Sequence, residues 1–381
     1  MTDVATRIKL LYERNPDSRR IVGAIRRMAE RASSKVGEPI KIMNFCGTHE
    51  WTISYYGLRS LMPSSVELVA GPGCPVCVTP GSYVEQLAKL STEGYTILTY
   101  GDAYRLPSLP TSRYRSLEHA RSLGGKVEVV YSFVEVLKIA RERRSENFIF
   151  FAVGFETTIP STSIPLYAGV VPGNLLILTA YRLTPPIMRY LVEKQGAESL
   201  HGVIAPGHVS AVLGSNAWRF LPEEFSIPTV VAGFEPVDVL LAVLEILRQL
   251  AEGKPRLVNE YTRVVKPEGN EAVKKFMWYT HRVVDAYWRG VGVVPRSGVE
   301  LQEKFARWSA KEQLGLRDPK EFEDVLPGCL CGAVVMGRAR PIDCPLFLRK
   351  CTPDRPYGPC MVSSEGTCRI WAENMPLELP V

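Results

Sequence analysis

Nine cysteines stand out among the 381 residues of this chain, and they fall into two groups. Three lie early, at Cys46, Cys74 and Cys77, and six lie between Cys329 and Cys368. No cysteine lies between the two groups. An odd number of thiols in a chain that resembles no secreted disulfide scaffold favours metal binding or thiol chemistry. We therefore expect two separate sulfur sites, one in each group.

The first candidate site is the heptapeptide NFCGTHE, which runs from Asn44 to Glu50. It places a thiol between a short apolar run and a helix that Thr48 could cap. A helix N-terminus and a nearby imidazole both favour the thiolate form of a cysteine. Cys46 is therefore a candidate nucleophile or soft metal ligand, and His49 could exchange its proton or share the metal. The alternative is a buried cysteine at a strand end and a hydrogen-bonded core histidine.

The second candidate site is the segment GPGCPVC, which begins at Gly71. Two glycines permit a tight turn, and Pro75 favours helical backbone directly after Cys74. This pattern predicts that Cys74 lies at a helix start with Cys77 one turn later, so that a disulfide can form and break between them. We expect Cys74 to be the more exposed and more acidic thiol. Half of a zinc site is the alternative, but no second close C-x-x-C completes it.

The C-terminal cysteines form the third candidate site. Structural zinc usually takes two tight cysteine pairs, whereas here long gaps rich in Pro and Gly follow the first pair. Such spacing favours an irregular segment wrapped around an iron–sulfur cluster, with four thiolate ligands and two spare cysteines. Zinc and unliganded thiols are the alternatives. The six cysteines are Cys329, Cys331, Cys344, Cys351, Cys360 and Cys368.

Short runs rich in β-branched and aromatic residues alternate with amphipathic stretches, which is the pattern of an α/β fold. Four of these runs lie in the first half of residues 41–232 and four in the second half. We therefore expect two similar α/β domains with parallel sheets that face a cleft. The predicted strands are 41–45, 66–70, 95–100, 126–132, 147–153, 174–180, 201–205 and 228–232.

Polar residues follow the carboxyl ends of these predicted strands, where open parallel sheets bind ligands. Besides Cys46, they include His208 in PGHVS, Glu156 in GFETT and Glu235 in GFEP. A cleft between the two sheets would bring them together. Alternatively, each Gly-Phe-Glu forms only a tight turn before a helix.

The character of the chain changes near Arg263. The segment 271–290 carries apolar residues at helical spacing, and the segment after Pro327 is rich in loops and cysteines. We therefore expect one α/β domain at 36–145 and a second at 146–262. A third domain, mainly helix and loop and carrying the cluster, is expected from 1–35 together with 263–381.

The composition excludes several classes of protein. The 46 basic and 40 acidic residues are dispersed, and the net charge of +6 does not indicate a nucleic-acid partner. The apolar runs are shorter than the ~18 residues of a membrane span. Charged residues interrupt the N-terminal region, which therefore does not resemble a signal peptide. We expect a cytoplasmic protein without a membrane span.

Together these motifs resemble the HypD family of [NiFe]-hydrogenase maturation factors. The resemblance rests on CGTHE at Cys46, GPGCPVC at Gly71, GFETT at Gly154, PGHVS at Pro206 and GFEP at Gly233. The C-terminal pattern of CGAVVMG, two single cysteines, GPCMVSSEG and a last cysteine extends it. The motifs occur in the family order over about residues 40–370, and none is broken.

The resemblance implies a function and partners. The protein would assemble the Fe(CN)₂CO group in complex with a small HypC-like chaperone. Cyanide would come from HypE, which carries it as a thiocyanate made with HypF. Cys46 would bind the cargo iron with a cysteine of the chaperone, Cys74 and Cys77 would form the redox dithiol, and His49 and His208 would line the cleft. The implied [4Fe–4S] ligands are Cys331, Cys344, Cys351 and Cys368, with Cys329 and Cys360 spare.

This resemblance suggests a mechanism. Thiocyanate releases cyanide from sulfur only on reduction, so the acceptor site needs two electrons, which a dithiol delivers together. We hypothesise that the cluster recharges Cys74 and Cys77, which then reduce the incoming ligand at iron held by Cys46, in a relay that resembles ferredoxin:thioredoxin reductase. The alternatives are a freestanding cluster-dependent thiol–disulfide oxidoreductase and a scaffold with purely structural metal sites. A radical enzyme is disfavoured because no CxxxCxxC triplet is present.

Overall fold

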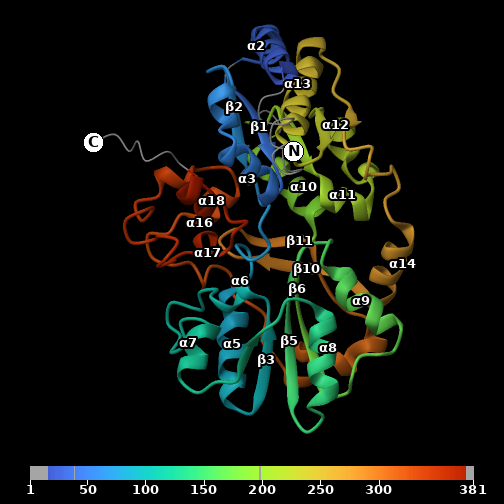
Figure 1. Cartoon of the computed structure of the whole chain (residues 1–381), viewed down its shortest axis with the longest axis vertical. Helices are drawn as coiled ribbons and strands as arrows, with labels where there is room; N and C mark the ends of the chain where they lie inside the picture. The colour runs from blue at the N-terminus through green and yellow to red at the C-terminus, as the bar shows by residue number, and fades with distance from the viewer. Residues whose placement is uncertain (1–15, 38, 197–198, 375–381) are drawn as a thin grey trace, which may run out of the picture. The chain divides into compact units, whose positions relative to one another are not determined.

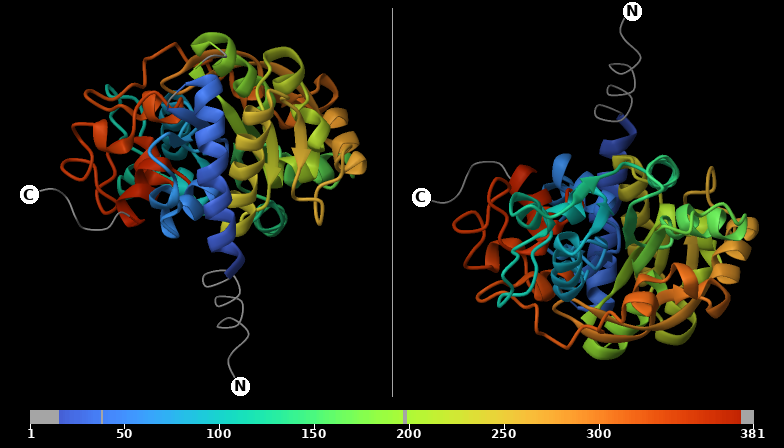
Figure 2. Two further views of the ribbon diagram at one scale, coloured as in Figure 1. Left: turned by 90° about the horizontal axis from the view of Figure 1, so that it is seen from above. Right: turned by 90° about the horizontal axis from the view of Figure 1, so that it is seen from below.

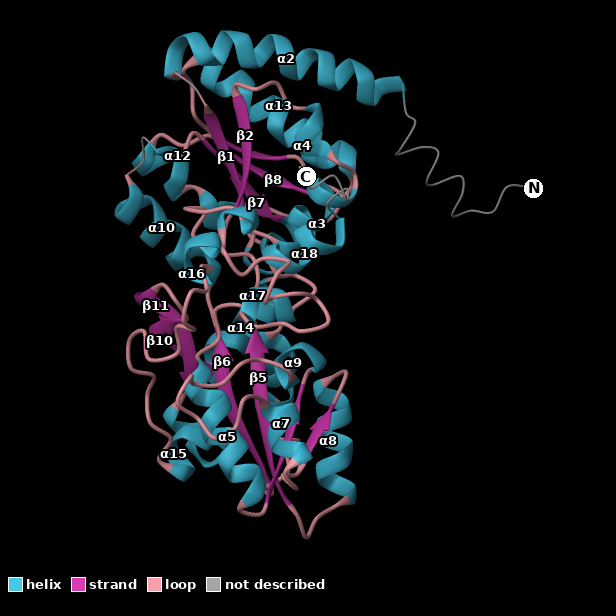
Figure 3. Ribbon diagram, turned by 90° about the vertical axis from the view of Figure 1, so that its left-hand side faces the viewer, coloured by secondary structure: helices cyan, strands magenta, loops and turns pink. Residues whose placement is uncertain are grey.

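The computed structural model describes residues 16–37, 39–196 and 199–374. These residues form two compact units. Unit 1 comprises the described residues within Met1–Gly73, Met188–Asn270 and Glu373–Val381, and unit 2 those within Cys74–Ile187 and Glu271–Ala372. Each unit contains one parallel β-sheet with helices packed around it (Figure 3). The predicted α/β class with two parallel sheets is confirmed.

Unit 1 contains a five-stranded sheet in the order β2-β1-β7-β8-β9, in which all neighbouring strands are parallel. The chain runs from β1 to β2 on one side and from β7 through β9 on the other, so the strand order reverses between β1 and β7. Its strands are β1 (Ile40–Asn44), β2 (Val66–Ala70), β7 (Gly202–Pro206), β8 (Thr229–Ala232) and β9 (Leu257–Asn259). Its helices are α2 (Pro16–Val36), α3 (Gly47–Tyr55), α4 (Leu58–Leu61), α11 (Gly207–Leu213), η2 (Ser215–Trp218), α12 (Phe220–Phe225) and α13 (Pro236–Glu252).

Helices α2 and α13 cover this sheet side by side (Figures 1 and 2). In α2 the fully buried residues Ile25, Ala29 and Ala32 recur at helical spacing and form one apolar face. They join the same apolar core as Ile42 of β1 and Ile246 of α13. Burial of this stripe therefore explains why α2 forms a long helix.

Unit 2 contains a four-stranded parallel sheet in the order β4-β3-β5-β6 and an antiparallel hairpin, β10-β11. The strands are β3 (Tyr95–Thr99), β4 (Val127–Val129), β5 (Asn147–Gly154), β6 (Leu175–Tyr181), β10 (His281–Trp288) and β11 (Gly292–Leu301). The helices before the hairpin are α5 (Gly81–Thr92), α6 (Gly101–Tyr104), α7 (Leu117–Ser122), α8 (Phe133–Glu142), α9 (Ile159–Tyr167) and α14 (Glu271–Thr280). Those after it are η3 (Glu303–Trp308), α15 (Ala310–Leu314), α16 (Cys331–Val335), η4 (Pro341–Asp343), α17 (Pro359–Val362) and α18 (Thr367–Asn374). Helix α10 (Thr184–Gln195) begins in unit 2 and continues into unit 1.

Strand β5 shows why the second sheet is parallel and central to its unit. Its residues from Phe148 to Ala152 are all fully buried, so the strand is covered on both faces. An uninterrupted apolar run of this kind is typical of a parallel strand between two layers of helices. The eight predicted strands overlap β1 to β8.

The grouping of these strands differs from the expected one. The range 36–145 supplies β1 and β2 to one sheet and β3 and β4 to the other, and 146–262 is divided in the same way. The reason is that strands pair through distant contacts, which short sequence patterns do not specify. Helix α2 also belongs to unit 1 rather than to the cysteine-rich region, because its apolar face packs on α13. Residues 1–15 of that expected domain lie outside the described residues.

The predicted helix over 271–290 is only half correct. Helix α14 ends at Thr280, and β10 follows at once. The β-branched and aromatic residues after Thr280 favour a strand, and β11 provides an antiparallel partner for it. Within the part of the chain that the structure describes, no helix combines the length and apolarity needed to cross a membrane.

Candidate thiol and metal sites

Cys46 lies at the carboxyl edge of the unit 1 sheet, directly beyond β1. It is the N-cap residue of α3, which begins at Gly47, one residue earlier than the sequence predicts. The Gly47 amide donates to the Gly73 carbonyl at 3.2 Å, and a Cβ on Gly73 would lie 2.7 Å from the Cys46 backbone. A glycine at position 73 is therefore needed for this close approach. The positive end of the α3 dipole favours negative charge at the Cys46 sulfur.

A buried polar network fixes the start of α3. The Glu50 side chain is almost completely buried and accepts two hydrogen bonds from Arg59, at 2.7 and 2.8 Å. It also accepts one from the Asn44 amide at 3.0 Å. These contacts connect the end of β1 to α3 on both sides of Cys46, and they therefore hold the Cys46 backbone in place.

His49 is fully buried beneath the same edge. Its Nε2 donates to the Gly233 carbonyl at 2.8 Å, whereas its Nδ1 has no hydrogen-bond partner among the described residues. Burial lowers the pKa of His49 to about 4. The imidazole is therefore neutral at pH 7, with an acceptor lone pair at Nδ1.

His208 follows β7 at the first turn of α11 and lies on the same edge. Its ring packs on Phe234 at 4.1 Å, and His49 contacts the same phenyl ring at 4.8 Å. Desolvation lowers the pKa of His208. Cys46 and His208 follow β1 and β7, the two strands between which the order reverses, and this is where parallel sheets bind ligands.

Two further charged residues at this edge, Glu260 and Arg263, were not among those singled out from the sequence. Arg263 forms an ion pair with Asp238 of α13, and Glu260 lies next to this pair. Burial and then the Asp238 carboxylate raise the pKa of Glu260 to about 7. Glu260 and Arg263 follow the three-residue strand β9, which no sequence pattern indicated.

Replacing His49 by glutamine should flatten the pH dependence of stability. The folded pKa of about 4 lies below the ordinary 6.5, so between these values the unfolded state binds more protons and stability is lost as the pH falls. At ~1.4 kcal/mol per pKa unit, the wild type should lose about 3 kcal/mol more than the H49Q protein between pH 7 and pH 4. Urea unfolding at both pH values measures this difference. Parallel pH curves for the two proteins would show that His49 is charged in the folded state.

Glu156 of the GFETT motif makes buried contacts within unit 2. It is fully buried and accepts hydrogen bonds from the amide and hydroxyl of Thr184, at 2.6 and 2.7 Å. Burial raises the pKa of Glu156 to about 7. Because α10 begins at Thr184, the carboxyl group caps that helix rather than α9, the helix that follows the motif, so its role differs from the alternative stated for this motif.

Cys74 and Cys77 form a disulfide in unit 2. The two residues lie in a turn rather than at the predicted helix start, because α5 begins only at Gly81. Both are buried, and Cys74, the expected more exposed partner, exceeds Cys77 only slightly, at 4% against 1% exposure. The Cys77 amide lies 3.1 Å from the Cys74 sulfur and can donate to it, which would stabilise a thiolate at Cys74.

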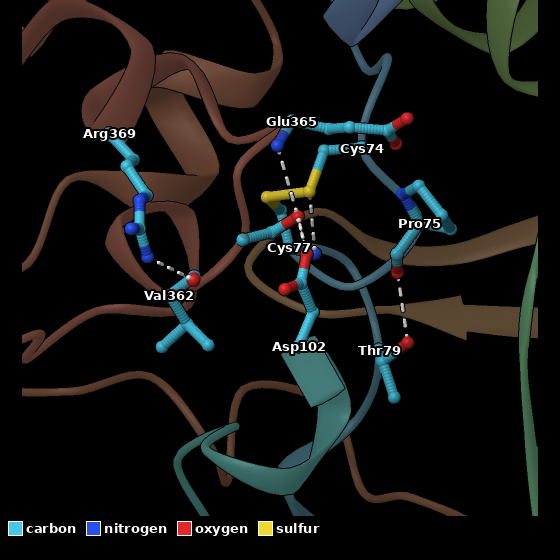
Figure 4. The surroundings of a disulfide bond; sticks show 9 residues. Cys74, Pro75, Cys77, Thr79, Asp102, Val362, Glu365 and Arg369 are labelled. Carbon is cyan, nitrogen blue, oxygen red and sulfur yellow. Dashed lines mark hydrogen bonds between the residues drawn. A yellow bond between two sulfur atoms is a disulfide. The ribbon is translucent and has the colours of Figure 1, made fainter. Parts of the chain in front are cut away.

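Two acidic residues, Asp102 and Glu365, lie in the surroundings of this disulfide (Figure 4). Asp102 accepts a hydrogen bond from the Ser363 hydroxyl at 2.7 Å, and the Glu365 amide donates to the same hydroxyl at 3.2 Å. Desolvation and then the Asp102 charge raise the pKa of Glu365. Helix α6 and the C-terminal segment thus each contribute one acidic residue to the surroundings of the sulfur pair.

The six C-terminal cysteines gather in unit 2. Three sulfurs, those of Cys331, Cys360 and Cys368, lie within 4.8 Å of one another, and the Cys329 sulfur is 3.2 Å from that of Cys331. Cys351 is electrostatically coupled to Cys329 and Cys344. Cys360, which was expected to be spare, thus belongs to the closest sulfur group.

These thiols fit a thiolate-bound metal group. Converging cysteine sulfurs with amide donors nearby are the ligand set of iron–sulfur clusters and of structural zinc. The Tyr357 and Gly358 amides donate to the Cys351 sulfur at 3.4 and 3.5 Å. A Cβ on Gly358 would lie 2.6 Å from the Cys329 sulfur, so only glycine leaves room for the sulfurs there.

Comparison with known proteins identifies the family. A family model for HypD, described as "Hydrogenase formation hypA family", matches residues 18–375. A hydrogenase expression/formation protein of Methanocaldococcus jannaschii is 40% identical over 356 residues, which are 93% of this chain and 96% of that protein. Hydrogenase maturation factor HypD2 of Bradyrhizobium diazoefficiens is 37% identical over 349 residues, covering 89% and 90%. Hydrogenase maturation factor HypD of Rhizobium leguminosarum bv. viciae is 38% identical over 363 residues, covering 92% and 93%. The match spans both sheets and both groups of cysteines, and the chain belongs to the HypD family.

Proposed function

We propose that this chain is a maturation factor for [NiFe]-hydrogenase. It serves as scaffold and redox partner for assembly of the Fe(CN)₂CO group, in complex with a HypC-like chaperone, and it receives cyanide from HypE, which works with HypF. The observation that carries this proposal is a redox-capable cysteine pair in the same unit as six gathered cysteines, in a chain of the HypD family. A dithiol and a candidate metal site in one unit suit a reaction that needs electrons at a soft metal.

The cysteine pair accounts for the electrons. Two thiols and one thiocyanate give a disulfide, the free carrier thiol and hydrogen cyanide, whose carbon then binds the cargo iron as cyanide with loss of the proton. One S–C bond breaks and one S–S bond forms, so the two electrons come from Cys74 and Cys77. One proton is released in total, and Asp102 or Glu365, the acidic residues in the surroundings of the disulfide, could accept it.

The carboxyl edge of the unit 1 sheet offers a binding site for the cargo iron. We propose that Cys46 binds this iron as a thiolate together with a cysteine of the chaperone. The α3 dipole favours the thiolate. His49 and His208 border the site. His208 lies at the surface of this edge, whereas the fully buried His49 supports it from beneath through the Phe234 ring that both histidines contact.

For the resident cofactor we propose a [4Fe–4S] cluster held by Cys331, Cys344, Cys351 and Cys368. Each thiolate binds a different iron, so the ligands must surround the cluster rather than one another. The choice follows the family resemblance, and it includes Cys331 and Cys368 of the closest sulfur group. When bound, the cluster supplies electrons one at a time.

We also propose a cytoplasmic location for the protein. The reason is that a dithiol which must be reduced again and again suits a reducing compartment.

Metal and sulfide analysis of protein purified without air tests this proposal. We expect about four irons and four sulfides per chain, and an additional low-spin iron in the Mössbauer spectrum of the complex with the chaperone. Zinc without sulfide would contradict the proposal and favour a scaffold with structural metal. Turnover of protein disulfides without any chaperone would instead favour the freestanding oxidoreductase.

A further inference from the structure

Arg289 is a buried cation that lies outside every motif described above. It follows β10 in the hairpin turn and is 4% exposed. Its guanidinium donates to the carbonyl oxygens of Pro107 at 2.5 Å, Asp324 at 2.8 Å and Ser108 at 3.4 Å. A buried charge costs free energy unless it is paired and hydrogen-bonded. The burial of the Arg289 guanidinium therefore calls for a counter-charge and for a role at this position.

The counter-charge is Asp324, whose side chain is completely buried. Its carboxylate lies 3.8 Å from Nε of Arg289. It also accepts hydrogen bonds from the Tyr287 hydroxyl at 2.6 Å and the Gly81 amide at 2.8 Å. Gly81 is the first residue of α5, so Asp324 caps the helix that follows the disulfide turn.

The same arginine holds the disulfide turn. Its backbone amide donates to the carbonyl of Val78 at 2.9 Å, and Val78 directly follows Cys77. The segment between the disulfide and α5 is therefore fixed at one end by Arg289 and at the other by Asp324. The backbone of residue 289 and the Asp324 side chain thus hold the segment that directly follows Cys77.

Arg289 also reaches the C-terminal cysteines. Gly290 and Gly332, which follow Arg289 and Cys331, pack backbone to backbone, since a Cβ on Gly332 would lie 2.2 Å from the Gly290 carbonyl oxygen. The guanidinium interacts electrostatically with the thiols of Cys329 and Cys331. In a buried setting such interactions are screened far less than in water.

We propose that Arg289 is a positioning residue that links the two sulfur sites of unit 2. Its backbone fixes the Cys74–Cys77 turn, and its charge stabilises negative charge on the C-terminal thiolates. It thereby raises the reduction potential of the cluster bound to them. The proposal rests on the proposed function, because it requires that these thiolates hold a cluster.

Asp324 allows a test of the direction in which each charge shifts the reduction potential of the cluster. Reduction adds an electron to the cluster, so a nearby positive charge favours the reduced state and a nearby negative charge disfavours it. Removal of the Arg289 charge should lower the potential, and removal of the Asp324 charge should raise it. A residue that only supports the fold would not produce opposite shifts.

The experiment compares Arg289→Gln, Asp324→Asn and Arg289→Lys with the wild type, all purified without air with their cluster. Redox titration followed by electron paramagnetic resonance measures the potential, and iron and sulfide analysis measures occupancy. We expect a tenfold change in the reduction equilibrium, about 59 mV for one electron, downward for R289Q and upward for D324N. R289K retains the charge and should stay near the wild-type value.

Shifts of the same sign in R289Q and D324N, or wild-type potentials in both, would overturn the proposal. If R289Q does not fold, the upward shift of D324N and the unchanged potential of R289K carry the test. Loss of the cluster from both D324N and R289K in folded protein would assign a purely structural role and overturn it. Zinc without sulfide in the wild type would defeat the proposed function itself, before any variant is measured.

Discussion

Replacing Cys74 by alanine should abolish cyanide transfer to iron while the iron and sulfide content stays unchanged. A single remaining thiol at Cys77 cannot close an internal disulfide, so the pair no longer delivers two electrons. Stability should change little, because the two cysteines are only three residues apart and a disulfide stabilises least when it closes a short loop. The effect should therefore be on chemistry rather than on folding.

Infrared spectroscopy of iron-bound cyanide measures this outcome. The C74A protein is combined with the chaperone and with HypE carrying thiocyanate, and the cyanide bands are compared with those of the wild type. Val76→Ala is a matched control, since Val76 is a buried residue of the same turn without a thiol. Normal cyanide bands with C74A would remove the dithiol from the mechanism.

Replacing Cys344 by alanine should reduce bound iron and sulfide to background, whereas replacing Cys360 should leave both near four per chain. The physical reason is that Cys344 belongs to the proposed ligand set, which surrounds the cluster. Because a metal group bound only by the folded state stabilises it, C344A should also unfold several kcal/mol more easily, on the order of the contribution of structural metals. Visible absorbance and thermal unfolding under argon follow both effects.

Comparison of the three alanine variants distinguishes between the two possible sets of cluster ligands. Cys331→Ala should lose the cluster under either assignment, because Cys331 belongs to both possible sets. If C360A loses the cluster and C344A retains it, the ligands are instead the closest sulfurs. That set is Cys329, Cys331, Cys360 and Cys368.

The local parts of the fold could be read from the sequence, and the distant pairings could not. Runs such as NFIFFAV and VELVA predict β5 and β2, because burial on one or both faces leaves a local pattern. Which strand lies beside which is decided by packing over long separations: β1 pairs with β7, about 160 residues away. Strand β10 was mistaken for helix because its apolar residues continue the spacing of α14.

The same distinction applies to the candidate sites. Cys46, Cys74 and His208 could be found because a rare residue type follows a strand or a glycine turn. Arg289 could not, because the chain contains many arginines and only its burial beside Asp324 sets it apart. For His49 the alternative of a hydrogen-bonded buried histidine describes its environment better than that of a proton donor, since burial keeps it neutral.

The division of the chain between the two units has a consequence for its biosynthesis. The chain passes from one unit to the other after Gly73, Ile187, Asn270 and Ala372. During translation, β1 and β2 emerge long before β7 to β9, so the unit 1 sheet must wait for more than a hundred further residues. The hairpin that carries Arg289 and all six C-terminal cysteines are synthesised later still. Assembly of the C-terminal cysteine group is therefore a late event, and a ribosome that stops early releases a chain with exposed sheet edges and without these six cysteines in place.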